Sequence, residues 1–163
     1  MMFNRKILGA QFAIAAFLTL TSSPSTFAQV TRYAQLTEGF FTDAQTPIPV
    51  PALVITLPAE APTQKEALIT LDMPNLFLGG KAVGSSTLGG QVAVFVDGTS
   101  VAVGQISDDS AALPGDGRKT VVLVVKVPLR SFQQTVEAKW NGVRGSAIAT
   151  DTFASLSATL VSK

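Results

Sequence analysis

Short runs in which apolar and polar residues alternate, separated by turn-forming residues, constrain the fold of this chain most strongly. Every second residue is apolar in Gln91–Val96 and again in Gln134–Trp140. Successive side chains of a strand point to opposite faces, so this period favours half-buried β-strands. After Gln29, no window sustains the 3.6-residue apolar period of a helix over three turns. The pattern predicts an all-β protein.

About eight short strands are expected between residues 52 and 163. They cover residues 53–57, 66–73, 91–96, 101–106, 120–129, 134–140, 146–150 and 155–161. Turn signals recur every ~8–12 residues, which is typical of an antiparallel β-sandwich or barrel. We therefore predict one antiparallel β-sandwich domain over residues 52–163.

Turn-forming residues indicate where the connections between these strands lie. Asp97-Gly98 tolerates the positive φ of a tight hairpin, and Asn141-Gly142 carries the same signal. The glycine-rich stretch 78–90 lacks the order of a phosphate-binding loop, so we expect an ordinary loop there. The polar stretch 107–119 is expected to be a surface loop. Thr120–Leu129 is apolar on both faces for half its length, which predicts a central strand or one covered on its second face.

Residues 1–28 have the pattern of a secretory signal peptide. Arg5 and Lys6 precede the apolar stretch Ile7–Leu20, and Thr26-Phe27-Ala28 places small residues before a cut at Gln29. The apolar stretch is shorter than the ~20 residues that span a bilayer. We expect an exported protein, in the periplasm, at the cell surface or secreted, with no membrane span in the mature chain. A cysteine-free exported domain of this size fits a bacterial source.

Residues 29–51 differ from the rest of the mature chain. The segment is polar and ends in alternating prolines over residues 47–51, which favour an extended conformation. It is expected to be an arm or a first strand. Its aromatic residues, Tyr33, Phe40 and Phe41, either cover one end of the sandwich or insert into a neighbouring subunit.

The absence of His and Cys excludes several chemistries. No Ser-His-Asp triad, thiolate nucleophile or cysteine-held cluster can form. Without residues 1–28 the net charge becomes −1, which gives no reason to expect nucleic acid as a partner. Carboxylates such as Glu137 and Asp72 remain as catalytic groups, but a small sandwich offers little cleft between them. We expect no enzyme and no cofactor, with a small carboxylate-dependent hydrolase as a remote alternative.

Two kinds of residue are candidates for binding. Asp108, Asp109 and Asp116 could supply carboxylates to Ca²⁺, but their spacing lacks a calcium-loop pattern, so a solvated loop is preferred. Trp140 and Tyr33 are the amphipathic aromatic residues that could stack on sugar rings. Trp140 shares a strand face with Val136 and Ala138, which favours a place in the core or at an interface.

The C-terminal half resembles a known family of β-sandwiches. Gln134–Trp140 (QTVEAKW) and Ala154–Leu160 (ASLSATL) resemble the last strands of jelly rolls of the tumour necrosis factor and complement-globular-head type. The Asp97-Gly98 hairpin lies at a comparable place. The resemblance implies a jelly-roll-like sandwich, a homotrimer and a binding role without catalysis, and it indicates no particular ligand.

These observations favour an exported, non-catalytic structural or interaction protein that self-associates. Association would form a closed trimer or add the 29–51 arm as a strand to a neighbour's sheet. A surface with few charges leaves room for such an interface. The alternative is a module that binds carbohydrate or another ligand, with a surface glycan or protein as partner.

Overall fold

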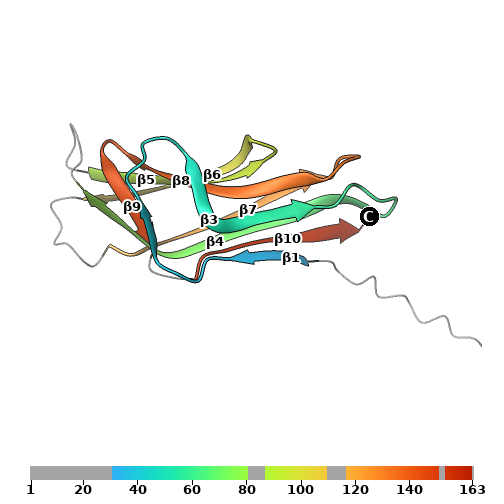
Figure 1. Ribbon diagram of the computed structural model, residues 1–163, viewed down its shortest axis with the longest axis horizontal. Coiled ribbons are helices and arrows are strands. Elements are labelled where there is room, and N and C mark those ends of the chain that lie inside the picture. Colours follow the sequence, from blue (N-terminus) through green and yellow to red (C-terminus); the bar gives the residue numbers. More distant parts are fainter. Residues whose placement is uncertain (1–30, 81–86, 110–116, 151–152, 163) are drawn as a thin grey trace, which may run out of the picture.

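The computed structural model describes residues 31–80, 87–109, 117–150 and 153–162, and in these ranges it contains strands and no helix. Two antiparallel sheets pack face to face, which confirms the predicted all-β sandwich (Figure 1). The described residues form ten strands, more than the eight expected. Their bounds are β1 Thr31–Gln35, β2 Phe40–Thr42, β3 Ile48–Leu57, β4 Gln64–Gly80, β5 Thr87–Val96, β6 Thr99–Asp109, β7 Lys119–Pro128, β8 Gln134–Val143, β9 Ser146–Thr150 and β10 Ser155–Ser162.

The long strand β4 organises the larger sheet, which we call sheet A. Its strand order is β1-β10-β4-β9-β2, and β7 pairs with β4 as well. The first half of β4 lies between β10 and β7, and its second half pairs with β9. The smaller sheet, sheet B, has the order β3-β8-β5-β6. Strands β1 and β3 are therefore sheet edges, and they contact each other along one open side of the sandwich.

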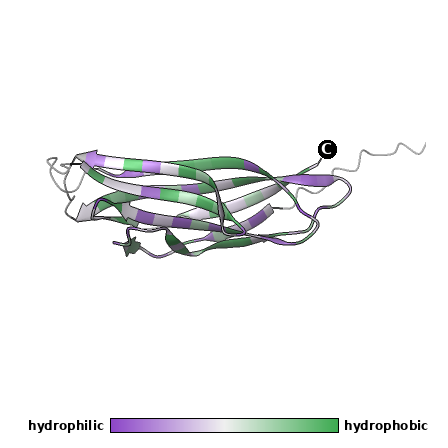
Figure 2. Cartoon of the chain, turned by 90° about the horizontal axis from the view of Figure 1, so that it is seen from above, coloured by the Kyte–Doolittle hydropathy of each residue, from purple (hydrophilic) through white to green (hydrophobic). Residues whose placement is uncertain are grey.

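The core follows the two-residue period of the sequence. Val92 and Val94 of β5 are fully buried, as are Val136, Ala138 and Trp140 of β8. Hydrophobic and hydrophilic residues alternate along the strands in Figure 2. Removing each large apolar side chain from water contributes about 1.5–3 kcal/mol, and this burial holds the two sheets together.

The predicted hairpin at Asp97-Gly98 is confirmed. Asp97 and Gly98 connect β5 to β6 with φ angles of 48° and 79°. The Asp97 carboxylate also accepts a hydrogen bond from the Thr135 amide at 2.9 Å, and the Asp97 amide donates to the Thr135 carbonyl at 2.9 Å. This aspartate therefore ties the hairpin to the neighbouring strand β8.

The turn predicted at Asn141-Gly142 is wrong, because both residues lie inside β8. The chain turns instead at Arg144 and Gly145, whose φ angles are 58° and 80°. Gly142 is required for close packing: a Cβ there would collide with the Ser146 carbonyl oxygen, and the Gly142 amide donates to the Ala44 carbonyl at 2.8 Å. In the sequence, a glycine that is needed for close packing inside a strand cannot be distinguished from a glycine that forms a turn.

Both predicted loops are shorter than expected. β4 continues to Gly80, β5 begins at Thr87, and β6 continues to Asp109. The glycines at the strand ends take part in the ladder, since Gly79 pairs with Ala147 and Gly90 with Gly142. Ladder hydrogen bonds use only the backbone, so pairing partners override the weak strand propensity of glycine here.

Strand β7 is neither central nor covered on its second face, contrary to the prediction. Within the described residues it pairs with β4 alone. Val122 and Val124 are 55% and 58% exposed. The apolar second face of β7 is thus a surface of this chain.

The N-terminal segment adds β1 and β2 to sheet A and contains the start of β3, which belongs to sheet B. β1 pairs with β10, β2 pairs with β9, and β3 begins at Ile48 beside Trp140. The predicted signal peptide, residues 1–28, lies outside the described residues. Among the residues that are described, no helix has the length and hydropathy to cross a membrane.

Candidate functional site

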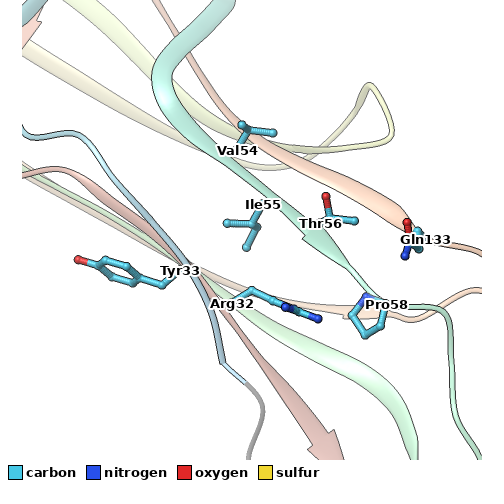
Figure 3. Close-up of a pocket in the computed structure, with 7 residues that line it drawn as sticks. All are labelled: Arg32, Tyr33, Val54, Ile55, Thr56, Pro58 and Gln133. Carbon is cyan, nitrogen blue, oxygen red and sulfur yellow. The ribbon is translucent and has the colours of Figure 1, made fainter.

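A groove opens where the edges of the two sheets meet. It has a volume of about 310 Å³. Figure 3 shows its lining residues, which come from β1, β3 and the ends of the adjacent connections: Arg32, Tyr33, Val54, Ile55, Thr56, Pro58 and Gln133. Because β1 belongs to sheet A and β3 to sheet B, neither strand could form this groove alone.

The strand period decides how Arg32 enters the groove. Arg32 lies opposite Ala158, which is fully buried, so the Arg32 side chain leaves β1 on the side that faces sheet B. In Figure 3 it extends toward Pro58. Thr56 comes from β3, where it lies opposite Thr135. The groove therefore combines a guanidinium group with hydroxyl, amide and apolar surface.

Arg32 is the charged residue of this groove. Within the described part of the chain its guanidinium makes no ion pair or hydrogen bond, and no acidic residue lines the groove. A guanidinium carries five N–H donors and is always charged. Such a group binds ligands rich in oxygen, either hydroxyl groups or an anion.

The outer face of sheet A is unusually apolar. Six large hydrophobic side chains of the described strands point outward from it with at least 39% exposure: Tyr33, Phe41, Leu68, Phe77, Val122 and Val124. We call these six residues the A-face. On the outer face of sheet B only Val54 and Val103 are comparably exposed among the described residues. One sheet therefore presents a surface suited to burial against another molecule.

The A-face residues form rows across the sheet. Tyr33, Ser157, Thr70 and Val124 lie side by side on β1, β10, β4 and β7. Further along, Phe41 and Phe77 flank Ala149 of β9. In both rows, smaller residues thus lie between larger apolar ones.

The aromatic candidates named from the sequence lie in different environments. Trp140 is fully buried, on the face it shares with Val136 and Ala138, so its ring is not available for stacking. Phe40 packs against Trp140 with ring centroids 6.5 Å apart. Tyr33 and Phe41 are 59% and 70% exposed and belong to the A-face.

The acidic candidates do not form a group in the described residues. Asp108 lies in β6 opposite Leu88, and its carboxylate is 3.9 Å from the Lys119 ammonium group. Asp109 ends β6, and Asp116 lies outside the described residues. No cluster of three or more potential metal-ligating side chains occurs in the described part of the chain.

The two carboxylates considered for hydrolysis lie on different sheets. Asp72 alternates with buried residues of β4 and points outward from sheet A, whereas Glu137 points outward from sheet B. Glu137 also pairs with Lys139 at 3.4 Å. A glycosidase needs its two carboxyl groups to be within ~10 Å across one cleft, and these two face away from each other.

Sequence reasoning missed Arg32, Thr56 and Gln133 as site residues. Arg32 directly precedes Tyr33, and a cation beside an aromatic residue in the N-terminal segment was an available signal. Nothing local indicates that β1 and β3 lie side by side, because that contact joins two different sheets.

Comparison with protein families gives one match over most of the chain. The model of the family described as "Bc2l-C, N-terminal domain" matches residues 31–159. A search of curated proteins found no match.

Comparison with solved structures gives matches of low identity. The insecticidal delta-endotoxin Cry8Ea1 from Bacillus thuringiensis is 14% identical with a TM-score of 0.39; the match covers 77% of this chain but only 19% of the endotoxin. The EclA C-terminal domain, a sugar-binding protein, is 12% identical with a TM-score of 0.39, covering 75% of this chain and 77% of that one. Eiger TNF from S. frugiperda is 6% identical with a TM-score of 0.38, covering 78% of this chain and 94% of that one.

The weak resemblance to jelly rolls of the tumour necrosis factor type is confirmed. The matched family, whose model covers residues 31–159, has a fold of that type.

Proposed function

The chain belongs to the Bc2l-C N-terminal domain family, and on that premise we propose that it is an exported, non-catalytic domain that binds carbohydrate and assembles with copies of itself. Membership of this lectin-like family supports the ligand class. Export rests on the signal-peptide pattern of residues 1–28. The lack of His and Cys, and the separation of Asp72 from Glu137, support a role in recognition.

The groove between β1 and β3 carries the carbohydrate proposal. A sugar presents hydroxyl groups that both donate and accept hydrogen bonds, above apolar C–H surface. Arg32 offers donors, Thr56 and Gln133 offer groups of both kinds, and Val54 and Pro58 offer apolar contact. The observation that matters most is the Arg32 guanidinium, which lines the groove with no partner in the described part of the chain.

A glycan microarray probed with the labelled protein, followed by calorimetry on the best ligand, tests this proposal. We expect Arg32→Gln to lower the affinity for that ligand about tenfold or more, because a charge-assisted hydrogen bond is lost. Arg130→Gln is the matched control, since Arg130 lies beside Phe132 outside the groove. The proposal fails if no glycan binds, or if both variants bind as well as the unmodified protein.

The A-face supports self-association. Burying exposed apolar surface contributes roughly 25 cal/mol per Å², and the A-face gathers most of such surface from the described strands. The charged residues near the A-face include Lys126 and Glu66, whose side chains pair at 2.9 Å. Because their charges are opposite, the pair adds little electrostatic repulsion between two associating chains. β1 already pairs with β10 of its own chain, so packing of sheet A against a neighbour is favoured over strand addition by residues 29–51.

Sedimentation equilibrium of two matched variants tests the assembly. Val124→Glu places a charge on the A-face, and Val103→Glu places the same charge at a valine of similar exposure on sheet B. We expect the unmodified protein and Val103→Glu to associate, while Val124→Glu remains a folded monomer. A monomeric unmodified protein at high micromolar concentration, or equal association of all three, contradicts the proposal.

A further inference from the structure

A second groove lies on sheet B, at the opposite end of β8 from the first. Gln133, which directly precedes β8, lines the first groove, whereas Val143 at the other end of β8 and Arg144 in the turn after it line the second. The second groove has a volume of about 250 Å³ and crosses β8, β5 and β6. The two grooves share no lining residue, so a ligand in one does not use side chains of the other.

A glycine shapes the floor of this groove. Gly89 of β5 lies between Val143 of β8 and Ser107 of β6. A Cβ at Gly89 would approach the Val143 Cβ to 3.2 Å, so any side chain there would crowd the groove. The absence of a side chain in the middle strand leaves a depression between two side chains on its neighbours.

Amide side chains form the next row of the sheet. Gln91 of β5 lies opposite Gln105 of β6 on one side and Asn141 of β8 on the other. Asn141 is buried and donates to the Gly142 carbonyl at 2.8 Å. Gln91 is half-buried and Gln105 is exposed, and neither side chain has a hydrogen-bond partner in the described residues. Each amide offers both a donor and an acceptor to a ligand.

Arg144 gives this groove a positive charge. It occupies the turn after β8 at a φ of 58°, and within the described residues its guanidinium has no ion pair. Among the described residues that line the groove, none is acidic. Asp108 on the adjacent strand is held by Lys119 at 3.9 Å. An anionic group at this end of the groove would therefore meet a guanidinium that forms no ion pair with any described side chain.

From these features we propose that the second groove binds an acidic sugar, a hexuronic acid residue, independently of the first groove. Arg144 pairs with the carboxylate, and Gln91, Gln105 and Ser107 hydrogen-bond the ring hydroxyl groups. The volume is below the ~300–1,000 Å³ of sites for drug-sized ligands, which suits a single sugar ring. With a site in each groove, one chain could hold two sugars at opposite ends of β8.

Side-chain amide resonances give a direct test. The ¹⁵N-labelled protein is titrated with galacturonate and, separately, with galactose, which differs from it in lacking the carboxylate. We expect galacturonate to shift the amide signals of Gln91 and Gln105 and to bind about tenfold tighter than galactose, since a guanidinium–carboxylate contact is charge-assisted. No shift of these two signals with galacturonate overturns the proposal.

Two variants test the roles of the Arg144 charge and of the depression at Gly89. Arg144→Asn keeps a residue that tolerates positive φ, and it should abolish the preference for galacturonate. Gly89→Val should fill the floor and remove binding of both sugars, with backbone spectra confirming the fold. Arg32→Gln is the control and should leave these shifts unchanged, even if the first groove binds no glycan at all. A preference that survives Arg144→Asn refutes the assigned role of Arg144.

Discussion

Arg32 and Tyr33 are consecutive residues of β1, and their side chains lie on opposite faces of that strand. Arg32 lies opposite the buried Ala158 and enters the groove beside β3, whereas Tyr33 lies opposite Ser157 and joins the A-face (Figure 3). One edge strand thus serves two surfaces, one for a ligand and one for a second chain.

This arrangement predicts that substitutions at Arg32 and Tyr33 differ in their effect on self-association. Tyr33→Ser should weaken self-association, because it removes the largest side chain of its A-face row. Arg32→Gln should leave association unchanged while it weakens glycan binding. Sedimentation equilibrium and calorimetry on both variants measure the two effects. Equal loss of association in both would show that the two faces of β1 do not act separately.

Trp140 should stabilise the fold through its size rather than through its ring nitrogen. Its Nε1 is buried and has no hydrogen-bond partner among the described residues. Trp140→Phe loses no such bond and should cost about 1–2 kcal/mol, whereas Trp140→Ala leaves a large cavity and should cost about 3–5 kcal/mol. Urea unfolding followed by circular dichroism measures both, because the chain contains one Trp and each variant loses its fluorescence. If both variants lost the same free energy of unfolding, Nε1 would have a hydrogen-bond partner outside the described residues.

Gly142 should be intolerant of any side chain, although it lies in a regular strand. Gly142→Ala brings a methyl group against the Ser146 carbonyl oxygen and should destabilise the protein by about 2 kcal/mol or more. Gly79→Ala is the matched control, because a Cβ there meets nothing within 4 Å, and it should change stability by less than ~0.5 kcal/mol. The midpoint of urea unfolding compares the two. A Gly142→Ala protein as stable as the control would contradict the packing described for β8.

Asp97 should contribute through both its backbone angle and its carboxylate. Asp97→Ala loses the hydrogen bond to the Thr135 amide and places alanine at a φ of 48°, so it should cost about 1–2 kcal/mol. Asp97→Asn keeps an acceptor oxygen and tolerates this φ, and it should cost less than ~0.5 kcal/mol. Thermal unfolding separates the two. A large loss in Asp97→Asn would mean that the negative charge itself is required.

The prediction of the fold succeeded where the signal was local. Val92, Val94 and Val96 alternate with less apolar residues, and the structure buries all three. Asp97-Gly98 carries its turn preference within two residues and forms the turn. Asn141-Gly142 carries the same kind of signal but lies in β8, where the Gly142 amide donates to the Ala44 carbonyl and a Cβ at Gly142 would collide with the Ser146 carbonyl oxygen. The hydrogen bond to Ala44 joins residues far apart in the chain, so no local pattern indicates it.

The candidate sites were much less predictable. Tyr33 was named from the sequence, but Arg32, Thr56 and Gln133 became site residues only when β1 and β3 met at the open side of the sandwich. The apolar second face of β7 was recognised from Val122 and Val124, and its exposure followed from the position of β7 outside β4. An apolar pattern in a sequence does not indicate whether those residues are buried by the same chain or exposed on its surface.

The sequence by itself determined that this protein is an all-β sandwich, which face of each alternating strand is buried, and which chemistries the absence of His and Cys excludes. The tertiary structure decided which strand edges meet, where the two grooves open, and which apolar face stays uncovered. The division has a physical reason. The two-residue period is a property of the local backbone, so neighbouring residues suffice to indicate it. Strand order depends on pairing between residues far apart in the chain, which no local pattern specifies.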